Sequence, residues 1–365
     1  MTAACERLPE KTRRISGKHF RHRQTNGAAL TDIYFSDCTF SQLSLEHIQG
    51  KALCFENCRF HDITLRAAEL ERCTFRQCQL TNIHMRDFCC LNLCWLECTG
   101  NHFALQQGLA ERWLLAGCHL ESASWEKVTV HAWTAQDTVF SRSCIRGGRM
   151  QDTNWHGCTL RQLSWQATTL IRQVMGSCQL ERCRYLANPC DTLVWSHCQL
   201  HNVNLRQLNL ENASFQLSHL ASCSLKRCNL SAALFTRATL VRCDLSRAQL
   251  SCAQLTDAVL TDCQLRAAGL IRACLRRATL TACHLQQTNF TRADLRCADL
   301  TTTSLGAAFT GDARLHGAQL HPQDQHLQEP EPLMNHIESW YSRHRPGPEN
   351  LPLSALPPTG VRSYV

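Results

Sequence analysis

The sequence predicts one continuous solenoid built from five-residue repeats, and three observations support this. Of the 59 positions from Leu30 to Leu320 whose number is a multiple of five, 52 hold Leu, Phe, Trp, Met, Ile, Val or Tyr. A second series, mostly Ala or Cys after residue 205, lies two residues before the first. Aromatic residues also recur in steps of 20, as in the series Phe35, Phe55, Phe75 and Trp95. Neither the 3.6-residue period of a helix nor the two-residue period of a strand produces this pattern.

Composition excludes several other classes of protein. The chain has 365 residues, an apolar fraction of 44% and a net charge of +8. An extended disordered chain is excluded by the apolar fraction, and the charge is too small to indicate a nucleic-acid-binding protein. The chain has 25 cysteines, but it is too long to be a small protein stabilised by disulfides, so that class is excluded as well.

Residues 233–255 show the repeat most clearly, because ALFTRATLVRCDLSRAQLSCAQL is A-x-L-x-x repeated. This segment resembles the pentapeptide-repeat family, and the resemblance extends over residues 28–320. It implies an all-β fold, a right-handed quadrilateral β-helix with four pentapeptides in each coil. About 14–15 coils are then expected, and at roughly 4.8 Å between coils they form a rod about 70 Å long. The central large residue and the small residue two before it would point inward.

The array is expected to have flanking segments and a division within it. Residues 1–27 form a basic N-terminal segment. Within 28–320, the part before residue 200 is degenerate, since large residues such as Ile33 and Trp113 often occupy the small position, while 201–320 is regular. Residues 321–365 form a Pro-rich tail with one helix expected at 332–344.

The predicted tail helix has an apolar face. Leu333, Ile337, Trp340 and Tyr341 fall at helical spacing on one side. Two interpretations remain open: this face caps the last coil, or it docks a partner and the following Pro-rich segment is ordered on binding.

Basic residues of the regular part form a second candidate for partner binding. Residues 205–320 hold 13 basic and 7 acidic residues. Five of the basic residues share one side at the 20-residue step: Arg206, Lys226, Arg227, Arg247 and Arg266. They form either an ordinary solvated face or a docking surface for an acidic partner. Four more basic residues share the opposite side: Arg237, Arg276, Arg277 and Arg296.

No catalytic, cofactor-binding or metal site is predicted. Cys, Ser, Thr and Ala interchange at the small inward position, so the cysteines there are expected to act as small buried side chains. The chain contains no C-x-x-C, H-E-x-x-H, G-x-S-x-G or phosphate-cradling G-x-x-x-x-G-K-[ST] motif. We therefore expect a non-enzymatic protein.

Location and nucleic-acid partners follow from charge and hydropathy. The first 27 residues lack the apolar core of a signal peptide, and no stretch approaches the 18 apolar residues that span a bilayer. A cytoplasmic protein without a membrane span is expected. Some pentapeptide-repeat proteins resemble B-form DNA in shape and negative charge and protect type II topoisomerases. This rod is positive where it is most regular, so we expect neither that activity nor a nucleic-acid partner.

The degenerate Cys-, Trp-, Phe- and Leu-rich texture of the array, as in Trp155–Leu160, is also similar to accessory proteins of bacterial type VI secretion. That resemblance implies an adaptor that helps load effectors onto the secretion spike, with spike, adaptor or effector proteins as partners. The alternative is a secreted effector with a β-helical binding module, and a DNA-mimic topoisomerase-binding protein is a weaker one. Solenoids of this family often dimerise through a terminal coil, but the sequence identifies no surface for a homodimer.

Overall fold

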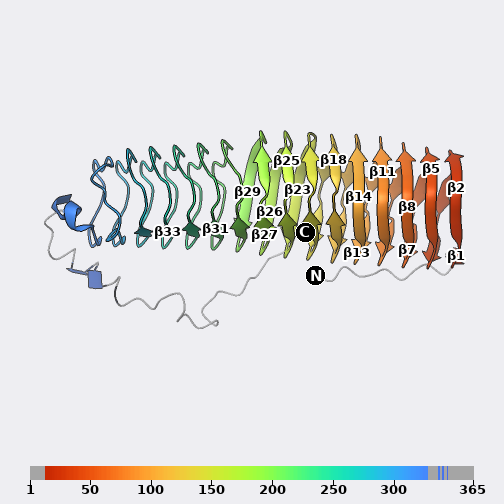
Figure 1. Cartoon of the computed structure of the whole chain (residues 1–365), viewed down its shortest axis with the longest axis horizontal. Coiled ribbons are helices and arrows are strands. Elements are labelled where there is room, and N and C mark those ends of the chain that lie inside the picture. The colour runs from red at the N-terminus through yellow and green to blue at the C-terminus, as the bar shows by residue number, and fades with distance from the viewer. Residues whose placement is uncertain (1–12, 328–335, 338, 341–342, 344–365) are drawn as a thin grey trace, which may run out of the picture.

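The chain folds as an all-β solenoid whose coils are stacked along one long axis (Figure 1). The structure is a computed structural model and describes residues 13–327, 336–337, 339–340 and 343. In these residues it contains 34 short strands and one 3-10 helix. The predicted fold class is confirmed.

Eight strands are long and cover two adjacent sides of a coil. The first five follow one another near the N-terminal end, and the last three lie in the middle of the rod. They are β2 (His19–Asn26), β5 (Thr39–Glu46), β8 (Arg59–Arg66), β11 (Gln79–Arg86), β14 (Thr99–Gln106), β23 (Arg149–His156), β26 (Thr169–Gly176) and β29 (Cys190–Ser196).

The other strands have three or four residues and each covers one side. They are β1 (Arg13–Ser16), β3 (Ala29–Thr31), β4 (Ile33–Ser36), β6 (Gln49–Lys51), β7 (Cys54–Glu56), β9 (Glu69–Glu71), β10 (Thr74–Arg76), β12 (Cys89–Leu91), β13 (Cys94–Leu96), β15 (Leu109–Glu111), β16 (Leu114–Ala116), β17 (His119–Glu121), β18 (Ser124–Glu126), β19 (Thr129–His131), β20 (Thr134–Gln136), β21 (Val139–Ser141), β22 (Cys144–Arg146), β24 (Thr159–Arg161), β25 (Ser164–Gln166), β27 (Gln179–Glu181), β28 (Arg184–Leu186), β30 (Gln199–His201), β31 (His219–Ala221), β32 (Thr239–Val241), β33 (Val259–Thr261) and β34 (Thr279–Thr281).

Every coil pairs with the next in parallel at a register of 20 residues. The pairing starts with Arg13 opposite Ile33 and continues through single bridges to Asp299 opposite Gln319. The distance between stacked rings gives the spacing between coils: the ring centroids of Phe55 and Phe75 are 4.8 Å apart. This equals the usual spacing of hydrogen-bonded strands.

The chain turns a corner once in every pentapeptide. Corner residues have positive φ, as at Asp32 (53°), Asp37 (55°) and Gln42 (52°), and the same spacing recurs along the described array. Four corners in 20 residues give the coil its four sides. The left-handed backbone conformation is unfavourable for most side chains. Bonds between coils offset this cost, as when the N–H of Arg247 donates to the carbonyl of Arg266 at 2.9 Å.

The type of turn changes near residue 200. From Leu208 onward, the N–H of the small inward residue on most sides donates to the carbonyl of the large residue three positions earlier, as from Ala233 to Leu230 at 3.1 Å. With positive φ only at the third residue, as at Ala232 (55°), these are type II β-turns. The change coincides with the division at residue 200 between degenerate and regular repeats.

Small inward residues also hold neighbouring coils together. The Cys98 Sγ donates to the carbonyl oxygen of Phe75, in the previous coil, at 3.3 Å. At the same position of other pentapeptides, the hydroxyls of Ser218 and Thr288 donate to the carbonyls of Trp195 and Leu265 at 2.9 and 2.8 Å. The position therefore favours a small side chain that can also donate a hydrogen bond, which explains why Cys, Ser and Thr interchange there.

The solenoid begins earlier than the predicted boundary at residue 28. Strand β1 pairs with β4 and strand β2 pairs with β5, so residues 13–26 already form part of a coil. Ile15 and Phe20 extend the series of large inward residues and pack against the core. Lys18 and Arg23 fall at the small inward positions, and both are exposed, since the described residues place no earlier coil against them.

The other end is closed by a short 3-10 helix, η1 (Pro322–Leu327), that the sequence did not predict. The side chain of Asp324 is 1% exposed. Its carboxylate accepts hydrogen bonds from the Leu305 N–H at 2.6 Å and the Ser304 hydroxyl at 3.3 Å. In earlier coils the N–H at this position bonds to a backbone carbonyl of the next coil, as from Leu265 to His284. Asp324 thus supplies the acceptor that a further coil would provide.

Candidate functional site

Five basic side chains lie on one corner of the regular half of the solenoid. Arg206, Lys226 and Arg266 fall in one column at the 20-residue register, and Arg227 and Arg247 fall in the adjacent corner column. All are at least partly exposed. We call these five residues the basic corner. It spans four coils, or roughly 14 Å at the spacing of parallel strands.

Backbone hydrogen bonds fix the positions of the Cα atoms that carry these side chains. The Asn204 Oδ1 accepts a hydrogen bond from the Arg206 N–H at 3.1 Å, which forms an Asx turn directly before that arginine. The N–H of Arg227 donates to the carbonyl of Ser246 in the next coil at 3.1 Å. The basic corner is therefore carried by a rigid backbone.

The charges of the basic corner are not neutralised within the solenoid. In the part of the chain that the structure describes, none of its five side chains forms an ion pair. The two nearest acidic groups in the register are bonded elsewhere. Asp244 accepts from the Ser246 N–H at 3.0 Å, and Glu211 lies 3.5 Å from the Asn229 amide nitrogen. Like charges on adjacent coils repel each other, and binding of an anionic partner would relieve this repulsion.

The first half of the solenoid is mixed. Nine of its Lys and Arg side chains pair with carboxylates, as Lys51 does with Glu71 at 3.1 Å. Others, such as Arg59 and Arg149, form no ion pair with the residues that the structure describes. Arg172 binds Asp152 through two hydrogen bonds of 2.5 and 2.7 Å. These bonds lower the pKa of Asp152 to about 2.

Two of the four basic residues opposite the basic corner are also paired. Arg277 binds Asp257 through two hydrogen bonds of 2.7 and 3.0 Å. Arg296 binds Asp294 through two of 2.8 and 2.7 Å. Part of the excess of positive charge predicted for residues 205–320 is therefore offset on this side, whereas the basic corner keeps its five charges together.

The tail candidates are only partly described. Residues 336–337, 339–340 and 343, within the predicted helix 332–344, are helical. Ile337 and Trp340 have 41% and 52% of their surface exposed. Leu333 and Tyr341 lie outside the described residues. The structure thus groups the five basic candidates on one surface and leaves two tail candidates untested.

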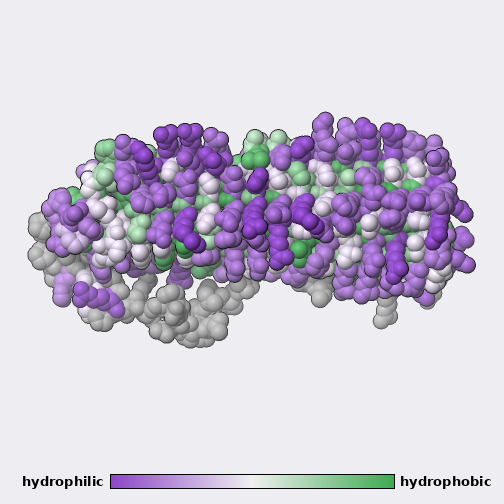
Figure 2. Space-filling model, viewed as in Figure 1, coloured by the Kyte–Doolittle hydropathy of each residue, from purple (hydrophilic) through white to green (hydrophobic). Residues whose placement is uncertain are grey.

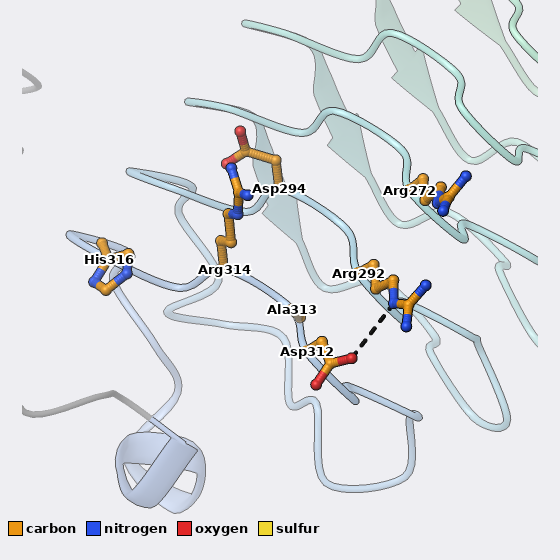
Figure 3. Close-up of a pocket in the computed structure, with 7 residues that line it drawn as sticks. All are labelled: Arg272, Arg292, Asp294, Asp312, Ala313, Arg314 and His316. Atoms are coloured by element: carbon orange, nitrogen blue, oxygen red, sulfur yellow. Dashed lines mark hydrogen bonds and ion pairs between the residues drawn. The ribbon is translucent and has the colours of Figure 1, made fainter.

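One surface was missed by the sequence argument. Near the C-terminal end, the last three coils form an open pocket of about 650 Å³ (Figure 3). Its lining is mostly charged: Arg272, Arg292, Asp294, Asp312, Ala313, Arg314 and His316. Aligning the last three coils at the 20-residue register would have placed most of these charges together.

Most thiols of the array are buried. In the described region, Cys58, Cys98 and most other cysteines lie in the core. Burial raises the pKa of Cys73 to about 11, so this thiol stays protonated at neutral pH. Among the described residues, no group of three or more His, Cys, Asp or Glu side chains could hold a metal ion. The described part of the chain also contains no helix long and apolar enough to cross a membrane.

Outside the core, the face seen in Figure 2 is mostly hydrophilic, with smaller hydrophobic areas between the polar side chains. A regular solenoid with this exterior is typical of repeat proteins that offer long surfaces for binding. Residues 198–237 match the family model for pentapeptide repeats (8 copies), and residues 233–309 match the model for a pentapeptide repeat region. Residues 198–309 thus carry pentapeptide repeats, and the fold is a β-solenoid of the pentapeptide-repeat type.

Solved structures with similarity to the chain include three pentapeptide-repeat or fluoroquinolone resistance proteins. HetL, involved in heterocyst differentiation regulation in the cyanobacterium Nostoc sp. strain PCC 7120, is 24% identical, with 61% of this chain and 91% of HetL covered and a TM-score of 0.34. A thylakoid lumen protein of Arabidopsis thaliana is 26% identical over 25% of this chain and 63% of its own, with a TM-score of 0.24. QnrB1, a plasmid-mediated fluoroquinolone resistance protein, is 16% identical over 60% and 94%, with a TM-score of 0.27. No curated protein matches the chain.

Proposed function

We propose that the protein is a non-enzymatic scaffold whose basic corner docks an acidic surface of a protein partner. The observation that supports this is the grouping of five cations on one corner, where they form no ion pairs among the described residues. By comparison, nine cations of the first half pair with carboxylates, as Lys51 does with Glu71. Repulsion between neighbouring coils is a cost to the solenoid, and an acidic partner would remove it.

The specific assembly that we propose is bacterial type VI secretion, with the protein acting in the cytoplasm as an adaptor between effector and spike components. Support for this comes from the degenerate Cys-, Trp-, Phe- and Leu-rich repeat texture alone. The alternative is that the protein is itself a secreted effector. A translocated fusion reporter would identify the effector, and retention in the producing cell would identify the adaptor.

The test compares two variants with the same net charge. In the first, Arg206, Lys226, Arg227, Arg247 and Arg266 are all replaced by Gln. In the control, five ion-paired arginines of the first half are replaced by Gln: Arg72, Arg112, Arg142, Arg161 and Arg182. Each full-length protein is used to capture partners from the producing bacterium, and the captured proteins are identified by mass spectrometry.

We expect the wild type and the control variant to retain an acidic secretion-spike or adaptor protein, and the basic-corner variant to lose it. Affinity of the purified pair should fall by at least about tenfold in the basic-corner variant and should weaken with added salt. Equal capture by both variants would show that the basic corner is only a solvated face. Capture of topoisomerase subunits by all three proteins would exclude the secretion assembly.

A truncated protein ending at Leu320 is unsuitable as the control for the tail, because it would also remove the cap formed by Asp324. Replacing Trp340 and Tyr341 by Ala leaves η1 in place. Weaker capture with an unchanged β-type circular dichroism spectrum would place part of the contact in the tail.

A further inference from the structure

A second charged surface lies at the C-terminal end and is separate from the basic corner. On the side of the coil centred on Leu275, Leu295 and Leu315, three successive coils align nine residues. The three rows are Arg272, Cys274 and Arg276, then Arg292, Asp294 and Arg296, then Asp312, Arg314 and His316. We call these nine residues the arginine grid.

Pairing between coils fixes the register of the grid. In its first column, the Arg272 N–H donates to the Thr291 carbonyl at 3.1 Å, and the Arg292 N–H donates to the Gly311 carbonyl at 2.8 Å. Single β-bridges join Asp294 to Cys274 on one side and to Arg314 on the other. The rigid solenoid therefore holds the arginines at set positions before any ligand binds.

A half-buried carboxylate lies at the centre. Asp294 has 20% of its side chain exposed and binds Arg296 through two hydrogen bonds of 2.8 and 2.7 Å. Burial alone would raise the pKa of Asp294, but the bonds from Arg296 and the charges of Arg296 and Arg276 lower it overall. In Figure 3 the side chain of Arg314 also points toward Asp294. This carboxylate orders the guanidinium groups around it.

The rim of the pocket is held much more weakly. Asp312 has 75% of its side chain exposed and contacts Arg292 through one pair of atoms 3.4 Å apart, the dashed line in Figure 3. Arg272 and Arg314 form no ion pair with any residue that the structure describes. Arg272, Arg292 and Arg314 thus line an open pocket of about 650 Å³.

From this arrangement we propose that the arginine grid binds a small molecule carrying a chain of phosphate groups. Guanidinium groups bind phosphate oxygens in pairs of parallel hydrogen bonds. The three coils extend over roughly 10 Å, more than one phosphate group covers, so a chain of phosphates can reach Arg272, Arg292 and Arg314 together. This site is independent of the protein-docking role of the basic corner.

Phosphate is favoured over carboxylate because the site already contains carboxylates. A single carboxylate ligand would offer Arg292 no more charge than Asp312 does. A phosphate chain brings several charges, so it would displace the exposed Asp312 and leave the central Asp294–Arg296 pair in place. Asp312 then acts as a built-in competitor, and its removal should strengthen binding.

The test is isothermal titration calorimetry of the full-length protein with tripolyphosphate at low salt, with citrate as the carboxylate arm and ATP as the nucleotide arm. Replacing Arg272 and Arg314 by Gln should weaken tripolyphosphate binding by about tenfold or more. Asp312→Asn should tighten it several-fold. Arg242→Gln and Asp262→Asn, at exposed corners of other sides, are the matched controls and should change affinity by less than about twofold.

Comparing tripolyphosphate with ATP distinguishes a free phosphate chain from a nucleotide. Equal binding of ATP and tripolyphosphate indicates that the phosphate chain alone is recognised, and tighter binding of ATP indicates a nucleotide. No binding of tripolyphosphate, equal binding of citrate, or equal effects of Asp312→Asn and Asp262→Asn would overturn the proposal. A clear preference for a single-stranded oligonucleotide over tripolyphosphate would also overturn it.

Discussion

The core of the first half contains polar groups that the repeat does not require. Gln173 is fully buried at a small inward position, between Thr153 and Leu193 in the register. Neither its side-chain oxygen nor its nitrogen has a hydrogen-bond partner in the described structure. By contrast, Thr168 is equally buried and its hydroxyl contacts three carbonyl oxygens, those of Ile145, Gly147 and Gln166. These two residues allow opposite predictions.

Gln173→Met should stabilise the protein, because it keeps the length of the side chain and removes two buried polar atoms without partners. We expect the free energy of unfolding to rise by about 1–3 kcal/mol, the usual cost of leaving such groups unsatisfied. Thr168→Val should lower it by about 1 kcal/mol, since a satisfied donor is lost. Urea titrations of both variants measure these changes. A loss of stability in Gln173→Met would show that the glutamine has partners in solution.

At the scale of the element, the cap at the C-terminal end depends on one side chain. Asp324→Ala removes the acceptor for the Leu305 N–H and leaves that donor buried beneath η1. We expect the coil 301–320 to lose about 1–3 kcal/mol of local stability. Hydrogen exchange of the Leu305 amide is the direct measurement. Unchanged protection of this amide would mean that water or another group replaces the carboxylate.

The elements differ in how far the sequence predicts them. The large residue in every fifth position determines the inward face, and for that reason the four-sided coil and its register could be predicted from Leu30 to Leu320. The N-terminal boundary was placed too late because Lys18 and Arg23 break the small inward series. The cap was missed because Asp324 acts through two hydrogen bonds, without any periodic pattern.

The same limit applies to the candidate sites. The 20-residue step was sufficient to group the basic corner, since Arg206, Lys226 and Arg266 are related by the register alone. The register also relates Arg277 to Asp257, one coil apart, but it does not say whether the two side chains form an ion pair. The arginine grid was missed because the basic residues were grouped on two sides only, without aligning Arg272, Arg292 and Arg314 in the last three coils.

The whole molecule joins two halves with different turns and different cores. Aromatic side chains fill much of the first half, and their rings stack from coil to coil, as Trp165 does on Tyr185 at 4.3 Å. The second half relies on Leu with Ala or Cys and on type II turns. In a solenoid each coil contacts only its neighbours, so stability is close to a sum of local terms, and a weak end can unfold before the rest.

Unfolding of the Asp324→Ala variant tests this picture of the whole rod. Its tryptophans in the array, Trp95 to Trp195, all lie in the first half, and Trp340→Phe removes the one in the tail. In this double variant, tryptophan emission reports the first half, while far-ultraviolet circular dichroism reports all coils. We expect the dichroism midpoint in urea to fall by about 0.5–1 M relative to Trp340→Phe alone, with the emission midpoint unchanged. If both midpoints fell together, the two halves would be coupled across residue 200 strongly enough to unfold as one unit.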